Sequence, residues 1–245
     1  LRFGNGDAML AMIERIARRE GLGDLLAQGS RRAARAIGRG AERYAVEVKG
    51  QEVAMHDPRC KYGHGLGLAV SPTGADHMHS VHDSGYQDAG GVAGLMPLGH
   101  LDPLPYDDLS VDKARMVRYA MLWRVTYNLT GICFFHFYTP QQVAELVGAV
   151  TGWNTSVQEL WLAAERAYGM ARAFNAREGF TAADDVLPKK GHQALVGGAT
   201  DGVRVTEDEF LRARAAYYRM AGWDEEGVPR TGTLERLGLG WVAAG

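Results

Sequence analysis

Cysteine is scarce in this chain, which has only Cys60 and Cys133 among 245 residues. Two thiols cannot build a disulfide framework, and such low usage is typical of a protein from the reducing cytoplasm. A run of about 18 apolar residues, which a membrane-spanning helix requires, is also missing. Neither sign of charge dominates, because 27 Lys and Arg face 29 Asp and Glu. The net charge of −2 argues against a nucleic-acid groove, which is normally basic.

The first residues lack both the basic and the apolar region of a secretory signal peptide. They also lack an initiator methionine, so we expect the chain to be part of a longer protein. With 46% hydrophobic residues, the chain has enough apolar surface for one large core or two smaller ones.

Glycine, in contrast, is abundant, at 32 of 245 residues. Nine of these glycines lie between Gly63 and Gly99, among His, Met, Leu and Val. A disordered linker would not carry so many apolar residues. The pattern therefore predicts ordered, irregular backbone that passes close to bulky groups.

Apolar residues at helical spacing predict helices in both halves of the chain. Asp7 is expected to cap a helix that ends before Gly21, and Asp24 a second helix that ends at Gly38. Between them and the glycine-rich segment, alternation over residues 44–55 predicts a short β-hairpin.

The second half begins with a helix from Asp108 or Ser110, whose apolar residues surround it and predict burial on most sides. Thr139-Pro140 predicts a further helix start, and capping boxes predict two more at Ser156 and Thr206. The fold class is therefore mainly α. The prolines at 103 and 105 mark the expected boundary between two helical subdomains, residues 1–104 and 105–245.

Six of the eight histidines fall in and around the glycine-rich segment: His56, His64, His77, His79, His82 and His100. If residues 77–82 are helical, His79 and His82 share a face and His77 points elsewhere. A zinc site would need a further ligand at a defined spacing, and the H-E-x-x-H motif is absent. Scattered surface histidines are the alternative. Clustering in glycine-rich backbone favours a pocket lining that transfers protons, because imidazole titrates near neutrality.

Cys133 follows the central helix at Gly131 and precedes His136. A lone cysteine there is by default a small core residue, but a helix end also suits a thiolate ligand. One thiolate cannot hold an iron–sulfur cluster, which takes four, so any partners would lie outside this chain. Cys60 is interpreted as incidental.

Seven segments in order carry a resemblance to one family: residues 21–29 (GLGDLLAQG), 48–52 (VKGQE), 56–59 (HDPR), 69–77 (AVSPTGADH), 131–134 (GICF), 222–224 (GWD) and 234–238 (LERLG). Each motif is weak alone, but their order along essentially the whole chain is specific. The chain resembles the C-terminal part, domains 2 and 3, of tungsten-dependent aldehyde:ferredoxin oxidoreductases.

This resemblance implies a three-domain enzyme in which an N-terminal β domain lies beneath two helical domains. It implies a bis-pterin cofactor of tungsten or molybdenum and a 4Fe-4S cluster that passes electrons to ferredoxin. Three cluster cysteines come from an upstream C-x-x-C-x-x-x-C run, which this chain lacks. Cys133 matches the fourth.

The resemblance also assigns individual residues. His77 matches a histidine close to the metal that handles protons, and His79 stands where the family often has a lysine near the pterin. Gly131, Ile132 and Phe134 match pterin-binding positions beside the cluster cysteine. Asn128 replaces the aspartate of a D-x-x-G-L-C pattern, so its carboxamide brings a hydrogen bond without a charge.

The expected function is that of a C-terminal fragment of an enzyme that oxidises small aldehydes to carboxylic acids. Alone, without the N-terminal β domain, the fragment is expected to be inactive. A tungsten enzyme of another substrate class, such as an aryl-CoA reductase, is one alternative. A helical interaction module without cofactor is the other, and the assembly into homo-oligomers stays open.

Overall fold

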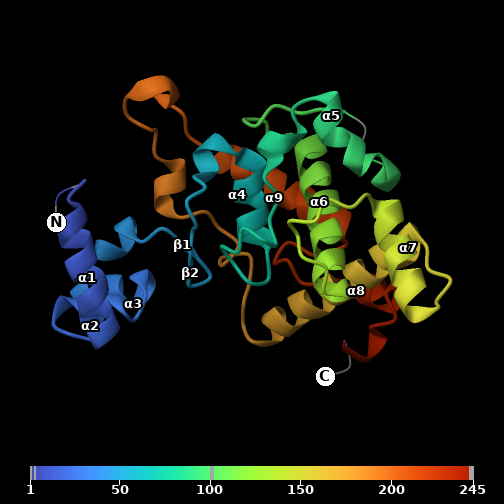
Figure 1. Cartoon of the computed structure of the whole chain (residues 1–245), viewed down its shortest axis with the longest axis horizontal. Helices are drawn as coiled ribbons and strands as arrows, with labels where there is room; N and C mark the ends of the chain where they lie inside the picture. Colours follow the sequence, from blue (N-terminus) through green and yellow to red (C-terminus); the bar gives the residue numbers. More distant parts are fainter. Residues whose placement is uncertain (1, 3, 100–101, 243–245) are drawn as a thin grey trace.

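The computed structural model describes residue 2, residues 4–99 and residues 102–242. These residues form many helices and a single small sheet of two strands, which confirms the mainly α prediction. Figure 1 shows α6 (Val111–Thr130) near the middle of the larger body, while the N-terminal helices lie to one side. Within the described residues, no helix is both long and apolar enough to cross a membrane.

The helices and strands, in chain order, have the following bounds: α1 Gly6–Arg18, α2 Leu22–Leu26, α3 Ser30–Ile37, β1 Glu47–Val48, β2 Gln51–Glu52, α4 Tyr62–Val70, α5 Ala89–Val92, α6 Val111–Thr130, α7 Pro140–Thr151, α8 Val157–Arg177, α9 Glu207–Ala221 and α10 Thr231–Arg236. Short 3-10 turns connect several of them, including Asp83–Tyr86 before α5.

The caps of the N-terminal helices differ from those expected. Asn5, not Asp7, caps α1, because its side chain accepts the Ala8 N–H at 2.9 Å. The second expected helix is two helices, α2 and α3. Gly29, with φ of +87°, interrupts them, since a left-handed residue cannot continue a helix. Asp24 therefore lies inside α2 rather than at a cap.

The short hairpin is confirmed at β1 and β2, which pair antiparallel with Val48 opposite Gln51. Lys49 and Gly50 form its turn, and both have positive φ, of 52° and 88°. Two left-handed residues match the twist of the flanking strands, which is why such turns suit tight hairpins.

Helix α6 is the centre of the core, as its apolar sequence predicts. It packs against α4, α8 and α9. Ser110 caps it by accepting the Lys113 N–H at 3.2 Å, while Asp108 accepts the Ser110 hydroxyl. The caps predicted for the later helices are also confirmed, with capping boxes at Thr139, Ser156 and Thr206.

One hydrophobic core includes residues from both sides of residue 105. Leu66 and Val70 of α4 belong to it together with Met121 of α6 and Tyr217 of α9. A smaller cluster between α6, α7 and α8 contains Trp123.

A buried charge network fastens the hairpin to this core. The Asp185 carboxylate pairs with Arg172 of α8 and with Lys49 of the hairpin turn, each at 2.6 Å. Tyr218 of α9 donates its hydroxyl hydrogen bond to the same carboxylate. Burial lowers the pKa of Lys49, although Asp185 opposes the shift. Two buried cations thus depend on one carboxylate.

Candidate active site

The glycines of α4 allow the following segment, residues 71–82, to lie close to the helix. A Cβ atom at Gly67 would stand 2.2 Å from the Ser80 hydroxyl oxygen, and one at Gly63 would stand 2.9 Å from the Asp83 carboxylate. Ser80 also donates a hydrogen bond to the His64 carbonyl at 3.0 Å. The glycine-rich backbone is therefore ordered and makes close approaches, as its composition predicts.

This approach brings together His56, His64, His77 and His82, here called the histidine cluster. The His82 ring centre lies 4.4 Å from that of His56, 4.9 Å from that of His64 and 6.1 Å from that of His77. His56 and His77 are 5.4 Å apart. Four imidazoles from three segments therefore meet at one place.

His64 is the buried member of the cluster and is fully shielded from solvent. Its Nδ1 donates to the Val81 carbonyl at 2.9 Å, because a carbonyl can only accept. Its Nε2 is then the unprotonated nitrogen, and it has no hydrogen-bond partner among the described residues. Burial, followed by the charge of His82, lowers the pKa of His64 to about 3.

His82 is half-buried, and the Lys61 ammonium donates to its Nδ1 at 3.3 Å. Burial and then Lys61 lower the pKa of His82 to about 4. Burial and Lys61 also lower the pKa of His56. These three histidines are therefore neutral near pH 7 and can accept protons only against a cost.

Asp83 holds the cluster in place. Its buried carboxylate accepts the N–H groups of Gly63 at 3.0 Å and His64 at 2.9 Å, at the start of α4. Lys113 of α6 pairs with it at 3.1 Å. One carboxylate thus connects α4, the histidine segment and the central helix.

Residues 77–82 are not helical, so the shared face expected for His79 and His82 does not form. His77 joins the cluster instead, and His79 lies within 3.2 Å of the Asp76 carboxylate. His100 lies outside the described residues. Within the described chain, no group of three or more His, Cys, Asp or Glu residues has the geometry of a metal site.

The second predicted segment follows α6. Gly131 ends the helix with φ of +70°, and Asn128 is exposed in its last turn. The thiol of Cys133 is free and exposed. Gly131, Ile132 and Cys133 line a cavity of about 720 Å³ against α7, and the exposed Trp153, just beyond the end of α7, lines it too.

A different cavity, of about 490 Å³, connects the two predicted segments. His82 lines it together with Phe134 and His136 of the loop after α6. Arg124 of α6 lies between them, with its guanidinium carbon 3.1 Å from the centre of the Phe134 ring. The structure therefore places His77 in the histidine cluster and Phe134 in a cavity that the same cluster borders.

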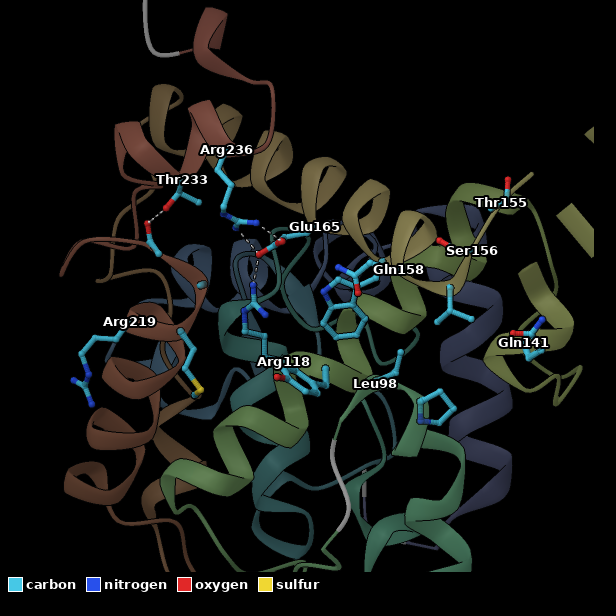
Figure 2. Close-up of a pocket in the computed structure, with 17 residues that line it drawn as sticks. Leu98, Arg118, Gln141, Thr155, Ser156, Gln158, Glu165, Arg219, Thr233 and Arg236 are labelled. Atoms are coloured by element: carbon cyan, nitrogen blue, oxygen red, sulfur yellow. Dashed lines mark hydrogen bonds and ion pairs between the residues drawn. The ribbon is translucent and has the colours of Figure 1, made fainter. Parts of the chain in front are cut away.

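A cavity of about 920 Å³ lies elsewhere, between α6, α8 and α10. Figure 2 shows Arg118 and Arg236 both directed at Glu165, which they contact at 2.5 and 2.9 Å. Burial raises the pKa of Glu165. The hydrogen bonds from Arg236 and the charge of Arg118 outweigh burial, so the pKa is lowered overall. None of the predicted site residues lines this cavity, and its central charges satisfy one another.

Sequence reasoning missed Lys61, Asp83 and Arg124 as parts of the site. Lys61 contacts His82 and Asp83 contacts the start of α4 only because α4 packs against residues 71–86, and no local sequence motif predicts that packing. Arg124 could have been found only as a charge on a helix that is otherwise apolar on most sides.

The described residues form a mainly α fold in which His82 and the loop after α6 line one cavity. The family model described as aldehyde ferredoxin oxidoreductase, domains 2 & 3, matches residues 1–239. The chain belongs to this family.

Relatives agree with the assignment. The chain is 31% identical over 242 residues to a tungsten-containing aldehyde ferredoxin oxidoreductase of Pyrococcus furiosus, covering 97% of this chain and 38% of that protein. A protein of the same name from Thermococcus kodakarensis is 30% identical, again with 97% and 38% coverage. The chain thus spans less than two fifths of the relatives' length.

Two further matches have other names. An aliphatic sulfonate oxidoreductase, WOR-like subunit, of Pyrococcus furiosus is 26% identical over 98% of this chain and 36% of that protein. The active site complex BamBC of benzoyl coenzyme A reductase with 1,5 dienoyl-CoA has the same fold, with a TM-score of 0.72 and 21% identity over 100% of this chain and 40% of that one.

Proposed function

We propose that this chain is the C-terminal part of a tungsten-dependent oxidoreductase that converts aldehydes to carboxylic acids and passes the electrons to ferredoxin. The observation that carries the proposal is the cavity that His82 of the histidine cluster lines together with Phe134 and His136 of the loop after α6. The tungsten-containing relatives support it. The first segment belongs to residues 1–104 and the second to 105–245, which we propose as the two subdomains facing the cofactor.

The residues present fit the expected cofactors. His64 Nε2 is buried and lacks a partner in the described part of the chain, so it is ready for a polar ligand. His79, Asn128, Gly131, Ile132 and Phe134 would contact the pterin. The free thiol of Cys133 would supply the fourth cluster ligand, since iron–sulfur clusters take thiolates.

The reaction needs a proton acceptor. Converting an aldehyde and water to a carboxylic acid releases two electrons and two protons. A bis-pterin tungsten (or molybdenum) cofactor, when bound, supplies the two-electron oxidation. His77 would take a proton from the reacting water, and the centres of the His56 and His82 rings lie 5.4 and 6.1 Å from the centre of its ring.

Two other functions remain as alternatives. An aryl-CoA reductase would share this fold, as the benzoyl coenzyme A reductase complex does. A cofactor-free interaction module would not need an exposed free thiol beside a glycine that ends the helix. An N-terminal β domain outside this chain and a cytoplasmic location are parts of the same proposal, and a small aldehyde is its substrate.

Cys133→Ser tests the cluster assignment in the full-length protein. Serine replaces a soft sulfur donor with a harder oxygen, so we expect loss of most of the cluster iron and slower reduction of ferredoxin. Cys60→Ser is the matched control and should keep both. Equal iron content in the wild type and Cys133→Ser would contradict the assignment.

His77→Ala tests the catalytic assignment. Loss of a positioned general base typically lowers turnover by roughly 10²–10⁴-fold. We expect this loss in turnover per bound tungsten, with tungsten content unchanged. An unchanged turnover per tungsten would assign His77 a structural role only.

A further inference from the structure

The cavity between the two predicted segments has an unusual lining. Its lining includes the aromatic side chains of Tyr86, Trp123, Tyr127, Phe134, Phe137 and Tyr138. Gly94 in the same lining leaves room, because a Cβ atom there would meet nothing within 4 Å. Its charged or titratable nitrogen groups are Arg124, His82 and His136. No Asp or Glu lines it in the described part of the chain.

Arg124 is the charge that this lining leaves unbalanced. Its Nη1 atom is buried and has no hydrogen-bond partner among the described residues. Burial lowers the pKa of Arg124 to about 10, so the guanidinium is still charged at pH 7. A buried cation without an anion is costly, and proteins normally pair it. Arg118 and Arg172 of the same molecule each have a carboxylate partner.

We propose that this cavity binds an organic carboxylate with an apolar, ring-sized body, and that Arg124 is its counter-ion. The body would lie between the aromatic side chains, and the carboxylate would accept the Nη1 hydrogen bond. A guanidinium suits a carboxylate because its donors match the two oxygens. The proposal rests on the proposed function in one respect, since the acid formed from an aldehyde is itself a carboxylate.

Arg124 would then determine specificity. Two sources of the carboxylate share this chemistry: the acid product of an aryl aldehyde, or the second acid group of an oxo acid substrate. For either ligand, the apolar lining of the cavity would favour a hydrophobic body, and the Arg124 guanidinium would favour the negatively charged carboxylate.

The experiment is a calorimetric titration of phenylacetate and of the neutral phenylacetamide into the protein. The two probes have nearly the same size, so the difference between their binding affinities reports the contribution of the negative charge. We expect phenylacetate to bind at least about 10-fold more tightly. In Arg124→Gln this preference should disappear, and in Arg124→Lys part of it should remain. Arg212→Gln, an exposed charge on α9, is the matched control and should keep the preference. Equal binding of both probes by the wild type would overturn the proposal, even where Arg124→Gln fails to fold.

A second measurement separates the sources. The Michaelis constants for para-formylbenzoate and for benzaldehyde are compared, in the wild type and in Arg124→Gln. A preference for para-formylbenzoate that the variant loses identifies an oxo acid substrate, and phenylacetate binding without such a preference identifies the acid product. If Arg124→Gln instead loses tungsten and pterin, the guanidinium serves the cofactor and the proposal is wrong. The titration needs no turnover, so absence of aldehyde oxidation by the full-length, tungsten-loaded protein would reject the proposed function and leave this result standing.

Discussion

At the scale of single residues, the histidine cluster should make stability depend on pH. An unfolded histidine has a pKa of about 6.5, whereas those of His64 and His82 fall to about 3 and 4 in the folded chain. Below about pH 6.5 the unfolded chain therefore binds protons that the folded one does not. The free energy of unfolding should fall as the pH is lowered from 7 to 4, and these groups should have no effect above pH 7.

His64→Asn isolates this effect. The asparagine amide can still donate to the Val81 carbonyl, but it does not titrate. The slope of unfolding free energy against pH between 6.5 and 4.5 should decrease by up to about 1.4 kcal/mol per unit. Urea titrations at several pH values measure it. His192→Asn, whose histidine also donates to a carbonyl, that of Val205, is the matched control. An unchanged slope in His64→Asn would show that the buried ring binds protons in the folded chain as readily as in the unfolded one.

At the scale of elements, glycines decide how close segments approach. Gly91 of α5 lies against the preceding turn, and a Cβ there would stand 1.9 Å from the Gly85 carbonyl oxygen. Backbone cannot rotate away as a side chain can. Gly91→Ala should therefore separate α5 from the turn and cost about 1–3 kcal/mol of unfolding free energy.

Gly94→Ala is the control for this prediction, because it lines the same cavity and its Cβ would meet nothing within 4 Å. It should change stability by less than about 0.5 kcal/mol. Thermal melts of both variants give the comparison. Equal melting temperatures would show that the turn and α5 can move apart without cost.

The same scale shows what sequence patterns can predict. Capping boxes at Ser156 and Thr206 are local, because a hydroxyl and a carboxylate three residues later satisfy each other's backbone groups. The break at Gly29 is also local, but the helical period continues across it and conceals it. Proximity of His77 to His56 depends on the path of residues 71–82 against α4, which no period encodes.

At the scale of the whole molecule, the family resemblance located the predicted site residues, and the core explains their proximity. Leu66 and Met121 belong to one core although they lie on opposite sides of the expected boundary at residue 105. Sequence composition could mark that boundary but not the contacts across it. The roles of Arg124 and Lys61 could not be predicted, because these contacts are what place Arg124 at the cavity lined by His82 and Lys61 beside the histidine cluster.

The buried network of Asp185 should be the strongest polar contribution to this shared core. Asp185→Asn removes the one carboxylate that Lys49 and Arg172 share, and it leaves two buried cations without a counter-charge. Breaking such a pair typically costs about 3–5 kcal/mol.

Because Arg172 lies 4.9 Å from the ring of Trp223, tryptophan fluorescence should report the loss of stability together with far-ultraviolet circular dichroism. Both signals should shift to the same lower urea midpoint, since one core includes residues from both sides of residue 105. Asp208→Asn, whose side chain is exposed, is the matched control and should stay within about 0.5 kcal/mol of the wild type. Two separate transitions in the wild type would show instead that residues 1–104 and 105–245 unfold independently.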